Sequence, residues 1–182
     1  MTGGDDSLVL IGLMGAGKTS IGRKLAKRLD LPFIDADEEI VEAAGCSIPD
    51  IFEIYGEPAF RDVEERVIRR LLDENPCVLA TGGGAFMNPR IRDAITQNAL
   101  SIWLKADLDV LVQRTSKRTG RPLLKGSDPR QILGDLMTAR YPIYALADLV
   151  VETGNESVNV TLESIMTALG DHLTTANGAQ QQ

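Results

Sequence analysis

The sequence is poor in the side chains that most often act as nucleophiles or soft metal ligands. Its 182 residues include one histidine, His172, and two cysteines, Cys46 and Cys77. The cysteines show neither metal-ligand spacing nor a disulfide framework, which suits a reducing compartment, so we expect a cytoplasmic protein. His172 stands near a polar C-terminal end, and we interpret it as a surface residue.

Long apolar runs and a surplus of positive charge are missing as well. No run approaches the roughly 18 apolar residues of a membrane helix, and the acidic, polar start MTGGDDS does not fit a signal peptide. Lysine and arginine total 19 against 26 acidic residues, which gives a net charge of −7. This balance argues against nucleic acid or an anionic membrane as the main partner.

Short apolar strands alternate with amphipathic helical segments along the chain. We expect strands at 8–11, 33–34, 77–81, 100–104 and 149–151, and helices at 18–29, 38–44, 47–55, 57–72, 88–98, 107–115, 128–145 and 157–169. Such alternation predicts an α/β fold with a five-stranded parallel sheet that is flanked by helices on both faces. We expect a single domain over 7–170, with disordered tails at 1–6 and 171–182.

The stretch Leu8–Thr19, LVLIGLMGAGKT, combines a buried strand, a glycine loop and a helix start. It fits the pattern G-x-x-x-x-G-K-[ST], with Gly12 and Gly17 as the spaced glycines. Glycines let the backbone approach an anion closely, and a helix N-terminus adds partial positive charge. Lys18 can reach the β- and γ-phosphates of a nucleotide, and the hydroxyl of Thr19 can bind Mg²⁺. The stretch therefore predicts a nucleotide phosphate site.

Two carboxylates follow the second expected strand. In the segment LPFIDAD, Asp35 and Asp37 stand two residues apart at the C-terminal edge of that strand, where parallel sheets bind ligands. One can serve Mg²⁺, usually through a bound water, and the other can accept a proton from an attacking hydroxyl. The alternative is that both residues only begin the next helix, where acidic residues are favoured.

The glycine run Gly82–Gly84 follows the next expected strand, at 77–81. Glycines at such a place indicate that the backbone comes close to another group. No aspartate ends this strand, although P-loop enzymes often hold Mg²⁺ with one, so Asp35 and Asp37 are the nearest substitutes. The glycine loop, the aspartates and the glycine run all follow strand C-termini, which predicts one shared site.

Segment 114–125 concentrates basic residues without an acidic one. A solvated surface loop is the simple interpretation, and the alternative is a mobile lid that excludes water and brings Arg121 to the transferring phosphoryl group. Arg61 and Arg140 stand apart from it. An arginine fork can hold a carboxylate or a phosphate, but sequence spacing does not show whether these two side chains converge.

Taken together, several segments resemble the shikimate kinase family over about residues 7–170. They are GLMGAGKTSIGRKLA at 12–26, FIDADEEI at 33–40, IFEIYGEPAFRDVEE at 51–65, LATGGGA at 79–85, RPLL at 121–124 and RYPIY at 140–144. The first is common among nucleotide-binding enzymes, but the combination is highly specific. The resemblance implies a P-loop kinase fold, like that of nucleoside monophosphate kinases. It also implies ATP-dependent phosphorylation of the 3-hydroxyl of shikimate, a step of chorismate and aromatic amino-acid synthesis.

The resemblance also implies a role for each candidate residue. Catalysis would involve Lys18, Asp37 and Arg121. ATP would contact Gly15, Ala16, Gly17, Lys18, Thr19, Ser20, Arg121 and Arg114, the last of them stacked on adenine. Shikimate would contact Asp37, Phe52, Phe60, Arg61, Glu64, Gly82, Gly83, Gly84 and Arg140. In that set the two arginines would clamp its carboxylate, and Glu64 would orient Arg61. Thr19 and Asp35 would hold Mg²⁺. We expect a monomer whose partners are ATP and shikimate.

Two other interpretations remain open at this point. One is a related small-molecule kinase, such as gluconate kinase, against which the Gly82–Gly84 run and the pair Arg61 and Arg140 argue. The other is a nucleotide-binding module without activity. Such a module should have lost Lys18, an aspartate or the lid arginine, and all are present.

Overall fold

The computed structural model describes residues 6–116 and 128–179. The strands are β1 (Ser7–Ile11), β2 (Phe33–Asp35), β3 (Val78–Ala80), β4 (Ala99–Lys105) and β5 (Leu149–Glu152). They form one parallel sheet in the order β2-β3-β1-β4-β5. This arrangement confirms the predicted five-stranded parallel sheet and places β1 at its centre.

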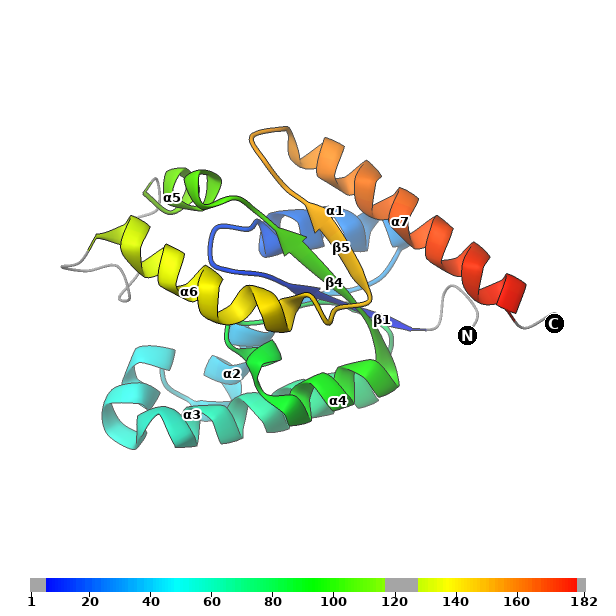
Figure 1. The fold of residues 1–182 in the computed structure, drawn as a ribbon. Coiled ribbons are helices and arrows are strands. Elements are labelled where there is room, and N and C mark those ends of the chain that lie inside the picture. The colour runs from blue at the N-terminus through cyan, green and yellow to red at the C-terminus, as the bar shows by residue number, and fades with distance from the viewer. Residues whose placement is uncertain (1–5, 117–127, 180–182) are drawn as a thin grey trace.

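Helices cover both faces of this sheet, as predicted (Figure 1). They are α1 (Lys18–Leu29), α2 (Ala36–Ala44), α3 (Ile48–Asp73), α4 (Pro89–Asn98), α5 (Leu108–Ser116), α6 (Pro129–Tyr144) and α7 (Val158–Ala179), with a 3₁₀ turn, η1, at Ala85–Met87. Helices α1 and α7 pack together over one face, and α4, with α3 packed against it, covers the other. Within the described part of the chain, no helix has the length and apolar character needed to cross a membrane.

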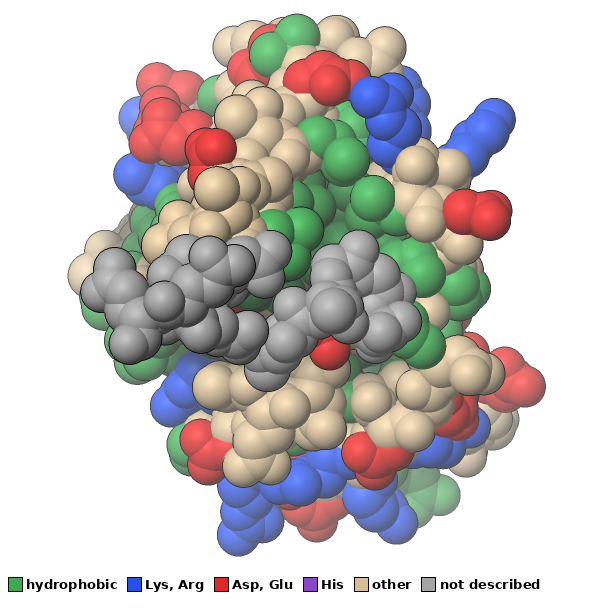
Figure 2. Space-filling model, turned by 90° about the vertical axis from the view of Figure 1, so that its right-hand side faces the viewer, with side chains coloured by type: hydrophobic (Ala, Val, Ile, Leu, Met, Phe, Trp, Pro, Cys, Tyr) green, Lys and Arg blue, Asp and Glu red, His purple; other side chains and the backbone are tan. Residues whose placement is uncertain are grey.

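The central strands are mainly apolar because both of their faces are buried. Val9 and Leu10 of β1, Leu79 of β3 and Ile102 of β4 have no exposed surface. The loops that leave their C-terminal ends therefore start from rigid positions at one edge of the sheet. The start of β1 and the end of α7 lie at the opposite end of the molecule (Figure 1), which faces the viewer in Figure 2.

Local sequence signals set several helix ends. Ser47 and Asp50 form a capping box at the start of α3, and Gly45 ends α2 with a φ of 68°, which glycine adopts readily. Gly56, with a φ of 80° and a ψ of 171°, interrupts the helical backbone inside α3, so the predicted break there is confirmed.

Three boundaries differ from the prediction by more than one residue. Helix α2 begins at Ala36 rather than residue 38, because the side chain of Asp35 caps it by accepting from the Asp37 N–H. Helix α7 continues to Ala179, so its predicted end at 169, and the disorder predicted for 171–179, were wrong. Gly170 did not end it, since a glycine costs a helix only about 1 kcal/mol. Residues 114–116, assigned to the lid, are the last turn of α5. Residues 1–5, 117–127 and 180–182 lie outside the described residues.

Candidate active site

The glycine loop after β1 takes a backbone path that requires glycine. Gly12 and Gly17 have φ values of 152° and 102°, a region that side chains disfavour. A Cβ on Gly12 would also lie 2.8 Å from the carbonyl oxygen of Leu104. Gly17 is the N-cap of α1 and offers no capping side chain, so the first N–H groups of that helix remain available to an anion.

Lys18 and Thr19 begin α1 directly beside this loop. The Lys18 ammonium donates to the carbonyl oxygens of Gly12 and Leu13 at 2.7 and 3.2 Å, which holds it over the loop. The Thr19 hydroxyl donates to the carboxylate of Asp35 at 3.2 Å. The loop, its lysine and the first aspartate therefore form one cluster at the C-terminal ends of β1 and β2.

Thr19 and Asp35 supply hydroxyl and carboxylate oxygens, which are the ligands that Mg²⁺ prefers. No group of three or more acidic, histidine or cysteine side chains that could hold a metal occurs among the described residues. A site with few protein ligands fits Mg²⁺ bound to nucleotide, because this ion keeps several waters and binds to phosphates as well. The residues present thus fit the ion that the sequence predicts.

Asp37 lies between the phosphate side and the glycine run. A Cβ on Gly82 would lie 3.0 Å from its Oδ1 and 3.3 Å from Oε1 of Glu64, so a side chain at residue 82 would press on both carboxylates. Desolvation by the surrounding protein and the charge of Asp35 raise the pKa of Asp37, and Lys18 partly opposes this. Asp37 thus lies close both to Lys18 on the phosphate side and to the glycine run on the other side of the site.

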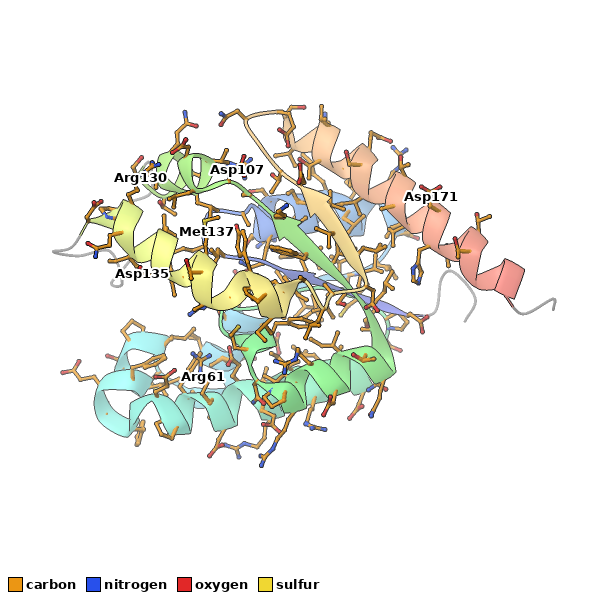
Figure 3. The ribbon with its side chains drawn as sticks, in the orientation of Figure 1. Arg61, Asp107, Arg130, Asp135, Met137 and Asp171 are labelled. Carbon is orange, nitrogen blue, oxygen red and sulfur yellow. The ribbon has the colours of Figure 1, made fainter. Side chains whose placement is uncertain are left out.

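Arg61 is held by two glutamates of its own helix. Its guanidinium donates to Glu64 at 2.7 Å and to Glu57 at 3.0 Å, and Figure 3 shows Arg61 on the side of α3 that faces the sheet. Glu64 is only 1% exposed. Burial raises its pKa, which Arg61 lowers in part. The resemblance implied that Glu64 orients Arg61, and the two side chains are paired. Glu57 was missed, although its position four residues before Arg61 is a helix-pairing signal.

The two arginines that stood apart in the sequence meet at the glycine run. A Cβ on Gly84 would lie 2.6 Å from Nη1 of Arg61, and a Cβ on Gly83 would lie 3.1 Å from Nη1 of Arg140. Helices α3 and α6 therefore place one guanidinium against each of two successive glycines. Such a pair can hold a carboxylate through charge-assisted hydrogen bonds.

Two phenylalanines lie beside Arg61. The rings of Phe52 and Phe60 are 4.6 Å apart between centroids, and the guanidinium carbon of Arg61 lies 5.1 Å from the Phe60 centroid. Phe60 is buried and Phe52 is 39% exposed. They offer an apolar wall next to the arginine, as expected for the ring of a small substrate.

Tyr144 also contacts the glycine run, which the sequence analysis did not predict. Its side chain is completely buried, and its hydroxyl donates to the carbonyl oxygen of Gly83. The segment RYPIY drew attention to Arg140 rather than to this tyrosine. Its place one helical turn after Arg140 is the signal that could have found it.

Arg114 connects the glycine loop with the loop that follows β5. Its guanidinium donates to the carbonyl oxygens of Gly15 and Ala16, both at 3.2 Å, and to the Thr153 hydroxyl at 3.2 Å. It also donates to the carbonyl of Gly154. Stacking of Arg114 on adenine stays a prediction. Arg121 lies outside the described residues.

A parallel sheet in this order, with a phosphate loop after its central strand, defines the class of P-loop kinases. The side chains that face the loop are those of a kinase with a small anionic acceptor. A family model described as shikimate kinase matches residues 14–171. The chain belongs to the shikimate kinase family and is an ATP-using transferase.

Curated relatives and solved structures agree with this assignment. The chain is 56% identical to a shikimate kinase of Caulobacter vibrioides over 90% of its length and 82% of that relative. It is 52% identical to a shikimate kinase of Mesorhizobium japonicum over 93% of its own length and 83% of that relative. A shikimate kinase from Acinetobacter baumannii, solved in complex with shikimate, has a TM-score of 0.86 and 36% identity, covering 92% and 94% of the two chains. A gluconokinase from Sinorhizobium meliloti shares the fold, with a TM-score of 0.64 and 18% identity. The match covers 98% of this chain and 99% of the gluconokinase.

Proposed function

We propose that this chain transfers the γ-phosphoryl group of ATP to the 3-hydroxyl of shikimate, giving shikimate 3-phosphate and ADP in the synthesis of chorismate and aromatic amino acids. The observation that carries the proposal is the convergence of Arg61 and Arg140 on the Gly82–Gly84 turn. An acceptor that carries a carboxylate for this pair, and hydroxyls within reach of Asp37, would fit the site. The family assignment and the shikimate complex of the Acinetobacter baumannii relative support the same acceptor.

The acceptor side would work by positioning. Arg61 and Arg140 bind the carboxylate, the N–H of Gly83 donates to the substrate, and Phe52 and Phe60 line the ring. Because Glu57 and Glu64 already hold Arg61, little side-chain entropy remains to be lost when substrate binds. Holding the acceptor at a fixed distance from ATP is the larger part of phosphoryl-transfer catalysis.

The phosphate side would supply electrostatic stabilisation. The loop at Gly15–Gly17 and the N-terminus of α1, with Ser20 in its first turn, cradle the phosphates, and Lys18 neutralises charge on the phosphoryl group. Mg²⁺, held by Thr19 and Asp35, would neutralise the charge on the phosphate oxygens. Arg114 would hold the adenine end of ATP. Arg121, on a lid that closes over the site, would add positive charge beside the transferring phosphoryl group.

Asp37 would hold the hydroxyl that attacks. Burial and the charge of Asp35 raise the pKa of Asp37, which makes the ionised carboxylate a better proton acceptor than an ordinary aspartate. The loose transition state of phosphoryl transfer needs little base catalysis. Orientation of the hydroxyl is therefore the role that we assign to Asp37.

Gluconate is the alternative acceptor that the fold alone would allow. It too carries a carboxylate, but it is an open chain without a ring to pack on Phe52 and Phe60. The test is ADP release measured with and without shikimate, with gluconate and quinate as controls. We expect stimulation by shikimate well above both controls, and no stimulation would refute the proposal. We further propose a cytoplasmic monomer, and a single mass equal to that of one chain in light scattering is the expected result.

A further inference from the structure

Helix α6 carries two tyrosines whose hydroxyls donate to backbone carbonyls. Tyr141 donates to Ala106, in the connection after β4, and Tyr144 donates to Gly83, in the glycine run. Both rings pack edge-on against Trp103, at centroid distances of 4.8 and 5.9 Å. The two residues thus make the same kind of contact in the same aromatic cluster, but only Tyr144 contacts the acceptor side of the site.

The surroundings of the Tyr144 hydroxyl contain a second site residue. A Cβ on Gly83 would lie 3.1 Å from Nη1 of Arg140 and 3.8 Å from the Tyr144 hydroxyl oxygen, so both atoms approach the same glycine. A tyrosine hydroxyl has one proton to donate and lone pairs to accept, whereas a guanidinium only donates. The hydroxyl can therefore give its proton to the Gly83 carbonyl and accept from Arg140.

The protonation state of Tyr144 supports this arrangement. Burial raises the pKa of Tyr144, and the charge of Arg140 lowers it in part. The shift is upward, so the hydroxyl keeps its proton at neutral pH and remains a donor to Gly83.

We propose that Tyr144 is a positioning residue for the acceptor, whose hydroxyl fixes the Gly83 peptide and the Arg140 guanidinium relative to each other. The inference rests on the proposed function, because these are the two groups that would meet the carboxylate end of shikimate. Without the hydroxyl, the Gly83 carbonyl and Arg140 each lose a partner, and the peptide and the guanidinium can move independently. Affinity for the acceptor then falls, while the phosphate loop is untouched.

Tyr144→Phe tests this inference, and Tyr141→Phe is its matched control. Both substitutions remove one hydroxyl that donates to a backbone carbonyl, from the same helix, and keep the ring in the aromatic cluster. For Tyr144→Phe we expect the KM for shikimate to rise about tenfold, as for loss of a hydrogen bond to a charged group, and the KM for ATP to stay unchanged. For Tyr141→Phe we expect neither KM to change. Emission of Trp103, the only tryptophan of the chain, and the melting temperature report whether the cluster stays packed.

A double-mutant cycle with Arg140→Lys separates positioning from general loss of stability. If Tyr144 acts through Arg140, the double variant should raise the KM for shikimate by less than the product of the two single effects. The inference would be overturned if the KM for shikimate of the double variant rose by the full product of the two single effects. Equal changes in the KM for shikimate and the KM for ATP in Tyr144→Phe would also overturn it. If the wild-type enzyme is active but Tyr144→Phe and Tyr141→Phe change the KM for shikimate equally, the role of Tyr144 is refuted while the proposed function stands. If the wild-type chain shows no turnover that depends on shikimate, the proposed function itself is refuted.

Discussion

Gly84→Ala provides a direct test of the arginine clamp, because it moves Arg61 without altering it. Gly84 has a φ of −95° and a ψ of −17°, a conformation that alanine adopts without strain. The new Cβ would lie 2.6 Å from Nη1, 2.8 Å from Nη2 and 3.0 Å from the guanidinium carbon of Arg61. Ordinary contacts between such atoms are about 3.5 Å, so the guanidinium must retreat by roughly 1 Å.

The cost of this retreat falls mainly on substrate binding. The backbone of residue 84 can stay in place, since the atoms in the way are the end of a flexible side chain. Arg61 would keep its charge but leave the position set by Glu64 and Glu57. A charge-assisted hydrogen bond contributes about 1.5–3 kcal/mol, which corresponds to about a tenfold to 150-fold change in affinity. The KM for shikimate should rise by that factor, and the KM for ATP should not.

The assay is ADP release at varied shikimate and at varied ATP, with calorimetric titration of shikimate as a second measure of affinity. Gly170→Ala is the control, because nothing lies within 4 Å of a Cβ at that position in α7. It should leave both KM values unchanged and raise the free energy of unfolding by about 0.5–1 kcal/mol. A folded Gly84→Ala enzyme with the wild-type KM for shikimate would refute the assignment of Arg61 to the carboxylate.

Three further predictions concern Asp37 and Arg114. Asp37→Asn should lower kcat by about a hundredfold with little change in ATP binding, because the attacking hydroxyl is no longer held in position, and turnover close to wild type would contradict its role. Since the pKa of Asp37 is raised, its protonated form stabilises the fold at low pH, and this contribution is lost as the pH rises through the raised pKa. Asp37→Asn should therefore raise the urea midpoint at pH 7, and a lower midpoint would contradict the shift. Arg114→Met should raise the KM for ATP about tenfold, because it removes the link between the glycine loop and Gly154. An equal rise in the KM for shikimate would speak against that link.

The parts of the site that could be predicted from the sequence are local. The glycine loop, Lys18 and Thr19 follow one another, so a strand and a helix start are enough to place them. Asp35 and the Gly82–Gly84 turn could be placed at the same edge because parallel strands share one direction. These predictions needed only the order of the elements.

The contacts between distant segments could not be predicted in the same way. Arg61 and Arg140 come from different helices, and only the packing of α3 and α6 around η1 brings them to neighbouring glycines. Periodicity indicates that a helix buries one face but not what that face meets. The resemblance to a known family implied that Arg61 and Arg140 act together, and the packing of the two helices gives the physical reason. The hydrogen bond of Tyr144 to Gly83 was missed for the same cause.

The central place of β1 has a consequence for how the chain acquires its ligands during synthesis. Strand β1 pairs with β3 and β4 rather than with β2, its neighbour in sequence. The glycine loop leaves the ribosome before the strands that hold it on both sides, which follow only at Val78–Ala80 and Ala99–Lys105. A nascent chain therefore cannot use ATP to stabilise itself until β4 has emerged. Arg140 emerges later still, and Thr153 and Gly154, which hold Arg114, follow it, so both ligand sites are complete only after β5 has emerged.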